Sequence, residues 1–430
     1  MIVPFVLTMA MQREAVYLWY FYKWLGECKK HGWAMIAQEE YFYDVKYYIS
    51  KGFQEAYNVE RARTFQYIPP KKDDLDKVKK YPIPKSLFED LEKEKGTHYN
   101  AYCSMLTEYC EPLGNLIESF ISDIEKSGEK IEAFAVLQHN QTLQEVASKH
   151  GIPVIHQEWG PFRKKMYLTT MYWDLKNLHY KSSVMERYEA FKKEVSANGL
   201  RLFTNKELLA LMLMPENLKY IKKMNGRPKF KLGLALGMTI EEIYTCHKFY
   251  TDMEMIYQSL KHYKRKDIII RRHPGEPYGS QYITFTDMMQ NEGNVVDFIL
   301  SCENIATVGS NVGIEAMFYD RGAYVFTEIP PYYVSSHDFA ETGKHAEKDF
   351  LNFFALCYLA PFDFMTDIEY IRWRLSNPSE TEIFKKHLEY YMSVKEIPMS
   401  VLDESDGKRL HSMIKIQLDN AAKSDEEASK

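Results

Sequence analysis

The chain has 430 residues, which is too long for one ordinary domain, and its hydrophobic fraction of 45% is sufficient for two packed cores. Its 55 basic and 60 acidic residues give a net charge of −5, which argues against nucleic acid as the main partner. The six cysteines contain no CxxC pair, so neither a zinc ribbon nor a disulfide framework is indicated, and a reducing cytoplasm is expected.

The N-terminal stretch is apolar but carries no basic leader, so we expect a strand and a helix here instead of a signal peptide. The strand is predicted at residues 2–8 and the helix at 14–31. The aromatic run 19–24 is predicted to lie in the core, with a position at a membrane interface as the alternative. No stretch reaches the roughly 20 unbroken apolar residues that span a bilayer. The polar, proline-punctuated residues 67–85 predict a loop with a short helix.

A compact βαβ unit is predicted at residues 133–156. Its helix would be capped by Asn140 and ended by Gly151. The crossover should be right-handed and the two strands parallel. The second strand would then carry Glu158 at its carboxyl end.

Glu158 is followed by a Gly160–Pro161 turn and by the cations Arg163 and Lys164. A carboxylate in a cleft can act as a general acid or base, and cations beside it can hold an acidic sugar. A salt-bridged turn residue is the alternative interpretation of Glu158.

A Gly-Arg-Pro break at residues 222–230 predicts a link between two domains, and a new apolar strand follows at 232–236. Next in the chain come Glu241 and Glu242, before a helix predicted at 243–262. The two glutamates either reach a cleft or form the acidic first turn that a helix macrodipole favours.

Three isoleucines at residues 268–270 predict a buried parallel strand. This strand delivers Arg271, Arg272 and His273 to its carboxyl end, which is where open α/β sheets bind ligands. The cations favour an anionic ligand, and the histidine can donate to a phosphate oxygen. An exposed turn with an incidental histidine is the alternative.

A further strand at residues 305–308 runs into a turn with Ser310 and Asn311 that opens a helix bearing Glu315. The helix amides and the serine hydroxyl can cradle a phosphate, and the glutamate can accept hydrogen bonds from ribose. The pattern is neither a nucleophile elbow nor a Walker loop. An ordinary capped helix start is the alternative.

His273 and Ser310 follow successive strands of one domain, so we expect neighbouring strand ends that grip a nucleotide phosphate together. The overall prediction is an α/β protein with two domains facing a central cleft. The predicted parts are an N-terminal acceptor-side domain (1–221), a linker (222–230), a nucleotide-sugar domain (231–360), C-terminal helices (361–415) and a polar tail (416–430), whose end, KSDEEASK, is expected to be frayed.

Three stretches carry a resemblance to a known group: NQTLQEVASKHGIPVIHQEWGPFR, RRHPGE and ATVGSNVGIEAMFYDRGAYVF. They resemble the bacterial capsule and lipopolysaccharide glycosyltransferases that include the retaining β-Kdo transferases. Those enzymes have a GT-B fold of two Rossmann-like domains and use CMP-Kdo. The resemblance covers roughly residues 132–330.

The resemblance implies a role for each matching residue at the nucleotide. His273 would bind the CMP phosphate, with Ser310 and Asn311 on the same group. Glu315 would face the ribose of the nucleotide. Independently of the resemblance, the charges of Arg271 and Arg272 are expected to raise the affinity for an anion at this strand end.

At the sugar, the resemblance implies that Glu158 is the acid/base carboxylate and that Arg163 lies near the sugar carboxylate, with Lys164 beside it. The chain departs from the group at two points. Its acidic motif has a tryptophan in the middle, and only Glu241 and Glu242 stand where a C-domain aspartate is expected.

The function implied is a metal-independent, cytoplasmic glycosyltransferase without a cofactor. It would transfer an acidic sugar, Kdo, from a CMP donor to a glycan or glycolipid acceptor, with peripheral contact at the bacterial inner membrane allowed. Three alternatives stay open: a GT-B transferase using a UDP- or GDP-sugar, a polyol-phosphate transferase of the CDP-glycerol type, and a non-catalytic nucleotide- or sugar-binding subunit of a polysaccharide assembly complex.

Overall fold

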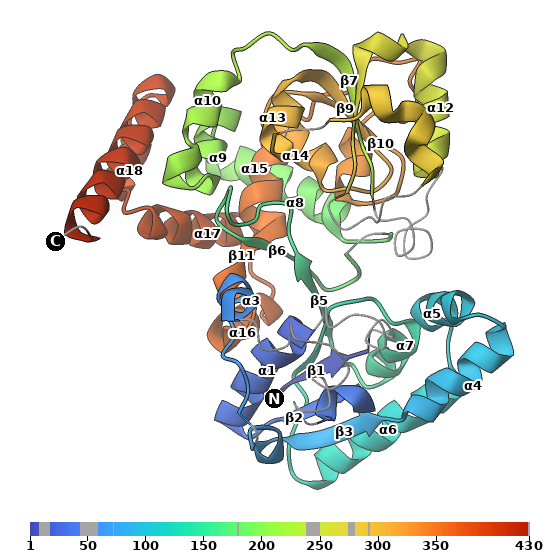
Figure 1. The fold of residues 1–430 in the computed structure, drawn as a ribbon. Coiled ribbons are helices and arrows are strands. Elements are labelled where there is room, and N and C mark those ends of the chain that lie inside the picture. The colour runs from blue at the N-terminus through green and yellow to red at the C-terminus, as the bar shows by residue number, and fades with distance from the viewer. Residues whose placement is uncertain are drawn as a thin grey trace. The chain divides into compact units, whose positions relative to one another are not determined.

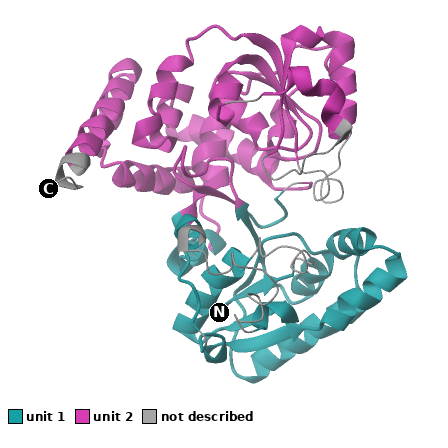
Figure 2. Cartoon of the chain, viewed as in Figure 1, with its two compact units in different colours: residues 1–158, 173–178, 363–375 teal, residues 159–172, 179–362, 376–430 magenta. Residues whose placement is uncertain are grey.

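The structure is a computed structural model that describes residues 1–7, 18–43, 59–71, 73–178, 180–237, 250–273, 280–290 and 293–428 (Figure 1). Contacts within the chain divide it into two compact units, which alternate along the sequence (Figure 2). Unit 1 comprises residues 1–158, 173–178 and 363–375. Unit 2 comprises residues 159–172, 179–362 and 376–430.

Unit 1 is built on five parallel strands that lie in the order β5-β4-β1-β2-β3. These strands are β1 (Ile2–Val6), β2 (Ala34–Gln38), β3 (Lys79–Ile83), β4 (Ala133–Val136) and β5 (Val154–Trp159). The central strand β1 reads IVPFV and is buried throughout. A parallel sheet needs such strands because both of its faces are covered.

The helices of unit 1 include the aromatic helix α1, in which Trp19, Tyr20, Phe21, Tyr22 and Trp24 are all buried. The prediction that this aromatic run lies in the core is therefore confirmed. The described helices of the unit are α1 (Leu18–His31), α3 (Val59–Phe65), α4 (Lys85–Lys95), α5 (His98–Thr107), α6 (Glu111–Lys126), α7 (Gln141–Lys149) and α16 (Ile368–Leu375), with 3-10 turns η3 (Glu39–Phe42) and η5 (Leu75–Lys77).

Helix α16 comes from far along the chain, yet it belongs to unit 1. Its Arg372 binds Glu132 with two hydrogen bonds, Nε to Oε2 and Nη2 to Oε1, each of 2.8 Å. The arginine holds the pKa of this carboxyl down to about 2. Unit 1 is therefore complete only with a segment from the last fifth of the sequence.

The prediction for residues 67–85 is partly wrong, because it contains the short helix η5 but misses strand β3. Tyr81 and Ile83 are buried, whereas Pro82 between them is exposed. β3 is the edge strand next to β2, and an edge position tolerates a proline because no neighbour needs its N–H.

The predicted βαβ unit is confirmed as β4, α7 and β5, with β4 and β5 parallel. Asn140 caps α7, since its side chain accepts a hydrogen bond of 2.8 Å from the Leu143 amide. Gly151 ends the helix region with a φ of +64°, which glycine adopts without strain.

Unit 2 has a second parallel sheet, in which the described strands lie in the order β10-β9-β7-β8. They are β7 (Phe230–Ala235), β8 (Ile268–Arg271), β9 (Cys302–Thr307) and β10 (Gly322–Val325). The chain passes from β7 to β8 on one side and then returns to β9 on the other side of β7. The switch point of the sheet therefore lies between β7 and β9, where α/β proteins bind ligands.

This strand order corrects one expectation. The ends of β8 and β9, which carry His273 and Ser310, are not neighbours, because β7 pairs with both strands and lies between them. Successive strands along a chain are adjacent in space only part of the time.

The helices of unit 2 cover both sides of this sheet, with α12 on one side and α13 and α14 on the other (Figure 1). The described helices are α8 (Val184–Asn198), α9 (Asn205–Met212), α10 (Lys219–Lys223), α12 (Asp252–His262), α13 (Val295–Leu300), α14 (Val312–Phe318), α15 (Lys348–Phe353), α17 (Glu380–Val394) and α18 (Asp406–Ala428). Shorter turns are η6 (Pro215–Asn217), η7 (Arg265–Asp267), η8 (Ser280–Met288), η9 (Pro330–Val334), η10 (Phe354–Tyr358), η11 (Phe362–Phe364) and η12 (Met399–Asp403). Two short strands, β6 (Thr170–Asp174) and β11 (Leu359–Pro361), pair antiparallel.

The units divide the chain differently from the predicted domains. Residues 159–172 and 179–221, predicted in the N-terminal domain, pack with the second half of the chain. The tail predicted from residue 416 is not separate from the C-terminal helices, since α18 continues to Ala428. The helix is anchored through Arg409, which is only 1% exposed.

Two parallel sheets, each with helices, confirm the predicted α/β class with two Rossmann-like parts and C-terminal helices. None of the helices in the described part of the chain has the length and apolarity needed to cross a membrane.

Candidate functional site

The carboxyl end of β8 carries the predicted cations. Arg271 is the last residue of the strand and is half-buried, and its Nη1 donates to Gln290 Oε1 at 2.7 Å and to the Gly293 carbonyl at 3.2 Å. Burial lowers the pKa of this guanidinium, and the charge of Glu315 opposes the shift. Arg272 and His273 follow and are both partly buried.

The turn after β9 is held by its own polar groups. The Ser310 amide donates to Thr307 Oγ1 at 2.9 Å, and the Val312 amide donates to Ser310 Oγ at 3.4 Å. Gly313 is closely packed, since a Cβ there would lie 3.1 Å from the side chains of Thr307 and Val325. The serine thus helps to cap α14, and the residue is partly exposed.

Asn311 occupies the N-cap position of α14, but its side chain does not cap the helix. Its Oδ1 instead accepts a hydrogen bond of 2.7 Å from the Tyr172 hydroxyl. The asparagine is therefore oriented by a residue that lies 139 positions earlier in the sequence.

Glu315 lies one turn into α14 and is 5% exposed. Burial raises the pKa of this carboxyl to about 7, although a hydrogen bond from Tyr167 and the charges of Arg163 and Arg271 lower it. The charges of Arg163 and Arg271, which were both predicted to bind the donor, therefore act on the carboxyl that was predicted to face the ribose. The carboxylate itself is covered by Tyr167, which is 2% exposed.

Tyr167 links Glu315 to Tyr319, because its hydroxyl lies 3.1 Å from the Tyr319 hydroxyl. Burial and the neighbouring carboxylate raise the pKa of Tyr167 well above its ordinary value. With Tyr167 donating to Glu315, the hydroxyl of Tyr319 is left to donate to Tyr167. The three groups form a buried chain of hydrogen bonds.

Tyr167 and Tyr172 were not among the residues predicted from the sequence. They belong to segment 162–172, in which aromatic residues are common and no spacing marks these two as special. Their importance follows only from tertiary contacts with a helix more than a hundred residues away.

The acidic motif lies at the end of β5, where Glu158 is the residue before the last and is partly buried. Glu158 belongs to unit 1, and the residues from Trp159 to Tyr172 belong to unit 2. Gly160 is required by space here, since a Cβ would lie 2.3 Å from Thr170 Oγ1 and 3.0 Å from its carbonyl carbon.

Arg163 is fixed by the residues of the motif. Its Nε donates to the Gly160 carbonyl at 2.9 Å, and its guanidinium carbon lies 5.1 Å from the centroid of the Trp159 ring. Trp159, in the middle of the motif, thus makes a cation–π contact with the Arg163 guanidinium. Lys164 is exposed.

Glu241 and Glu242 lie outside the described residues. At the end of β7, which precedes them, the Gly237 amide donates to Asp252 Oδ2 at 3.1 Å. Asp252 is a buried carboxylate in the first turn of α12, and this bond holds it beside the end of β7. In the sequence, Asp252 looks like no more than an acidic residue in the first turn of a helix, after the N-cap Thr251.

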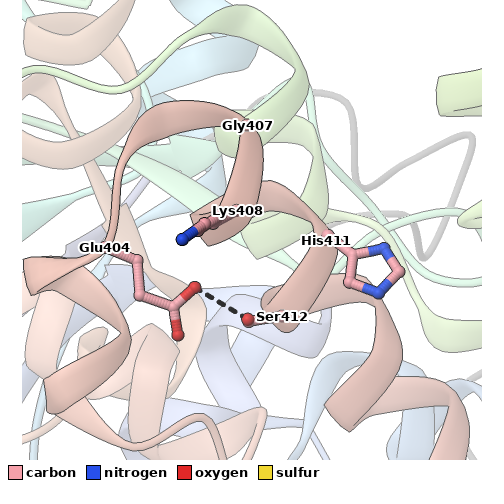
Figure 3. A pocket seen from close by; sticks show the side chains of 5 residues that line it. All are labelled: Glu404, Gly407, Lys408, His411 and Ser412. Atoms are coloured by element: carbon pink, nitrogen blue, oxygen red, sulfur yellow. Dashed lines mark hydrogen bonds between the residues drawn. The ribbon is translucent and has the colours of Figure 1, made fainter.

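A hollow elsewhere on unit 2 holds none of the predicted residues. It is lined by Glu404, Gly407, Lys408, His411 and Ser412, which all lie at or just before the start of α18 (Figure 3). Ser412 Oγ donates to Glu404 Oε2 at 2.8 Å, while the imidazole of His411 points away from this pair (Figure 3).

Comparison with known proteins places the first part of the chain in context. Residues 4–183 match the Glycosyltransferase 99 family N-terminal domain. This match confirms the predicted resemblance to glycosyltransferases. A comparison with curated proteins gave no match.

Among solved structures, the chain is similar to the β-Kdo 2,7 transferase of KpsC from Thermosulfurimonas dismutans, with 16% identity, coverage of 57% of this chain and 81% of that chain, and a TM-score of 0.38. The β-Kdo 2,4 transferase of the same KpsC has 15% identity, coverage of 57% and 87%, and a TM-score of 0.29. A UDP-GlcNAc 2-epimerase from Methanocaldococcus jannaschii has 14% identity, coverage of 88% and 94%, and a TM-score of 0.29. Similarities this low decide nothing about the reaction of this chain.

Proposed function

We propose that this chain, whose residues 4–183 match a glycosyltransferase family domain, transfers Kdo from a CMP-activated donor to a glycan or glycolipid acceptor. The product would be a bacterial surface polysaccharide, either capsule or lipopolysaccharide. The observation that supports a donor site most is the partly exposed turn at Ser310 and Asn311 after β9, where the Tyr172 hydroxyl donates to Asn311 Oδ1 at 2.7 Å.

In this proposal the phosphate of the donor binds at the carboxyl edge of the unit 2 sheet. His273 approaches it from β8, and Ser310 and Asn311 approach it from β9. Two strand spacings separate these strand ends, roughly 10 Å, which a phosphate between side chains can fill. The donors meet the charge that develops on the phosphate as CMP leaves.

The sugar end is assigned to the acidic motif. Glu158 acts as the acid/base carboxylate, and Arg163, Arg272 and Lys164 supply the positive charge for the carboxylate of an acidic sugar. Arg163 is suited to this because Trp159 and Gly160 already fix its guanidinium. Cations and amides would replace a divalent ion, so EDTA should leave the transfer rate unchanged.

The decisive experiment measures nucleotide binding and turnover with the whole chain. CMP and CTP should raise the melting temperature more than UDP and GDP. His273→Ala should lower kcat by about 100- to 1000-fold, the loss typical of one donor to a developing anion, with an unchanged melting temperature. Equal turnover in the variant would reject the assignment of His273.

A UDP- or GDP-sugar is the second candidate donor. The Ser310 turn fits such a donor equally well, because the phosphate that it would recognise is common to all nucleotides. Preferential stabilisation by UDP or GDP in the same experiment would select it.

A non-catalytic binding subunit is the alternative from another class. Transfer or donor hydrolysis by the purified protein, abolished in Glu158→Gln, would reject it. We place the protein in the cytoplasm, with peripheral membrane contact where the acceptor is a glycolipid. Co-sedimentation with acceptor-bearing vesicles, compared with plain vesicles, tests that contact.

A further inference from the structure

One face of α14 is covered by segment 162–172. The rings of Phe162 and Phe318 pack edge to face with centroids 5.0 Å apart. Tyr167 bonds with Glu315, and Tyr172 bonds with Asn311. Positions 311, 315 and 318 recur every three or four residues, so they lie on one face of the helix. The segment therefore runs along this face in the opposite direction to the helix.

The contact between Tyr172 and Asn311 has a chemical consequence. The amide of an asparagine has an oxygen that accepts and a nitrogen that carries two donors. Because the Tyr172 hydroxyl donates to Oδ1, the side chain is fixed with Nδ2 on its other side. Among the residues that the structure describes, Nδ2 has no acceptor, and Asn311 is partly exposed at the β9–α14 turn.

Tyr172 is itself held firmly. It is 2% exposed, and its ring packs edge to face on Phe354 and Tyr358, with centroids 6.2 Å and 6.1 Å away. Such packing restricts the ring of Tyr172, so its hydroxyl group is held in one position. Its partner amide consequently has one orientation as well.

We infer that Tyr172 is a positioning residue of the donor site, which orients the Asn311 amide so that its two N–H groups face the phosphate of the nucleotide. This inference rests on the proposed function, since it requires an anionic group at the β9–α14 turn. Tyr172 acts through Asn311 and does not itself touch the donor.

The experiment is a double-mutant cycle on the full chain, with the dissociation constant of CMP measured by calorimetry. Tyr172→Phe keeps the ring and removes the hydroxyl, and should weaken CMP binding about 3- to 10-fold. Asn311→Ala should weaken it about 10-fold or more, because a hydrogen bond to a charged group is lost. In the double variant, Tyr172→Phe should add no further loss.

Two further variants separate orientation from packing. Asn311→Asp keeps the acceptor for Tyr172 but replaces the donors with an oxygen, and should weaken CMP binding at least as much as Asn311→Ala. Tyr188→Phe is the matched control, because Tyr188 is 5% exposed and its hydroxyl donates to Asp349 at 2.7 Å in the same unit. It should leave CMP binding unchanged.

The inference is overturned if Tyr172→Phe binds CMP as the unchanged chain does, if the two losses add in full, or if Tyr188→Phe lowers the affinity equally. In each of these cases the proposed function stands, because the unchanged chain binds CMP. Absence of CMP binding in the unchanged chain would remove the CMP donor and this inference together.

Discussion

Arg409 of α18 and Glu207 of α9 form an ion pair closed to solvent, with Arg409 Nε 2.6 Å from Glu207 Oε1 and the two side chains 1% and 0% exposed. The same carboxylate accepts the Thr204 amide in the capping box at the start of α9. One glutamate thus begins a helix of unit 2 and also fixes the last helix of the chain.

Arg409→Met should lower the free energy of unfolding by about 3–5 kcal/mol, because it leaves a buried carboxylate without its cation. Glu207→Gln in addition should recover part of this loss, since glutamine preserves the capping box without a charge. Urea unfolding measures both. Arg201→Met, which breaks an exposed pair with Asp406, is the control and should cost less than about 1 kcal/mol.

Glu315 predicts a pH dependence of stability. Its pKa rises from an ordinary 4.5 to about 7 on folding, so the folded chain holds a proton that the unfolded chain has released between these values. Stability is therefore lost as the pH rises through this window. Relative to Glu315→Gln, the unchanged chain should lose about 2 kcal/mol between pH 5 and pH 8.

Urea unfolding at both pH values tests this expectation. Glu303→Gln removes an exposed carboxyl of β9 and serves as the matched control, which should follow the unchanged chain. If the free energy of unfolding changed by the same amount between the two pH values in the unchanged chain and in Glu315→Gln, the assignment of a buried proton to this site would be contradicted.

Gly160→Ala should destabilise the chain by about 1–3 kcal/mol, because the new methyl group meets Thr170 side chain and backbone together. The backbone part of this contact cannot move away cheaply, since Gly160 and Thr170 are bonded through their main chains at 2.9 Å. Gly26→Ala, in the exposed face of α1 with no atom near the new methyl group, should stabilise by about 0.5–1 kcal/mol. Thermal unfolding compares the pair, and an equal response would be inconsistent with the crowding at Gly160.

Asn140→Ala should cost about 1–2 kcal/mol, since it removes the cap of α7 and also leaves the buried Met105 carbonyl without the Asn140 Nδ2 donor. Thr97→Ala removes a cap of the same kind from α5 and should cost less, because that bond is exposed. Chemical denaturation measures the loss in the free energy of unfolding for both variants. A larger loss at Thr97 would speak against the buried second bond.

The sequence predicts the fold where local signals agree. The βαβ unit from β4 to β5 was recoverable because an apolar run, the Asn140 cap and the Gly151 stop are all within a few residues of each other. Strand β3 was missed because an edge strand needs only Tyr81 and Ile83 buried and admits a proline. The position of β7 between β8 and β9 depends on crossovers, which no local pattern encodes.

The candidate site divides in the same way. Strand ends with Arg271 and with Ser310 were predictable, because a buried apolar run followed by polar groups marks them. The burial of Glu315 was not, because the residue that covers it, Tyr167, comes from 148 positions earlier (315 less 167). Contacts at such separations depend on the tertiary fold alone.

The ion pair between Arg372 and Glu132 affects when unit 1 can finish folding during synthesis of the chain. During synthesis, the ribosome releases residues 1–158 long before α16, so the nascent first unit waits without its last helix while most of the second unit emerges. Folding on the ribosome should therefore proceed with the two units maturing late and together, and chains truncated before residue 363 should be trapped by chaperones or degraded.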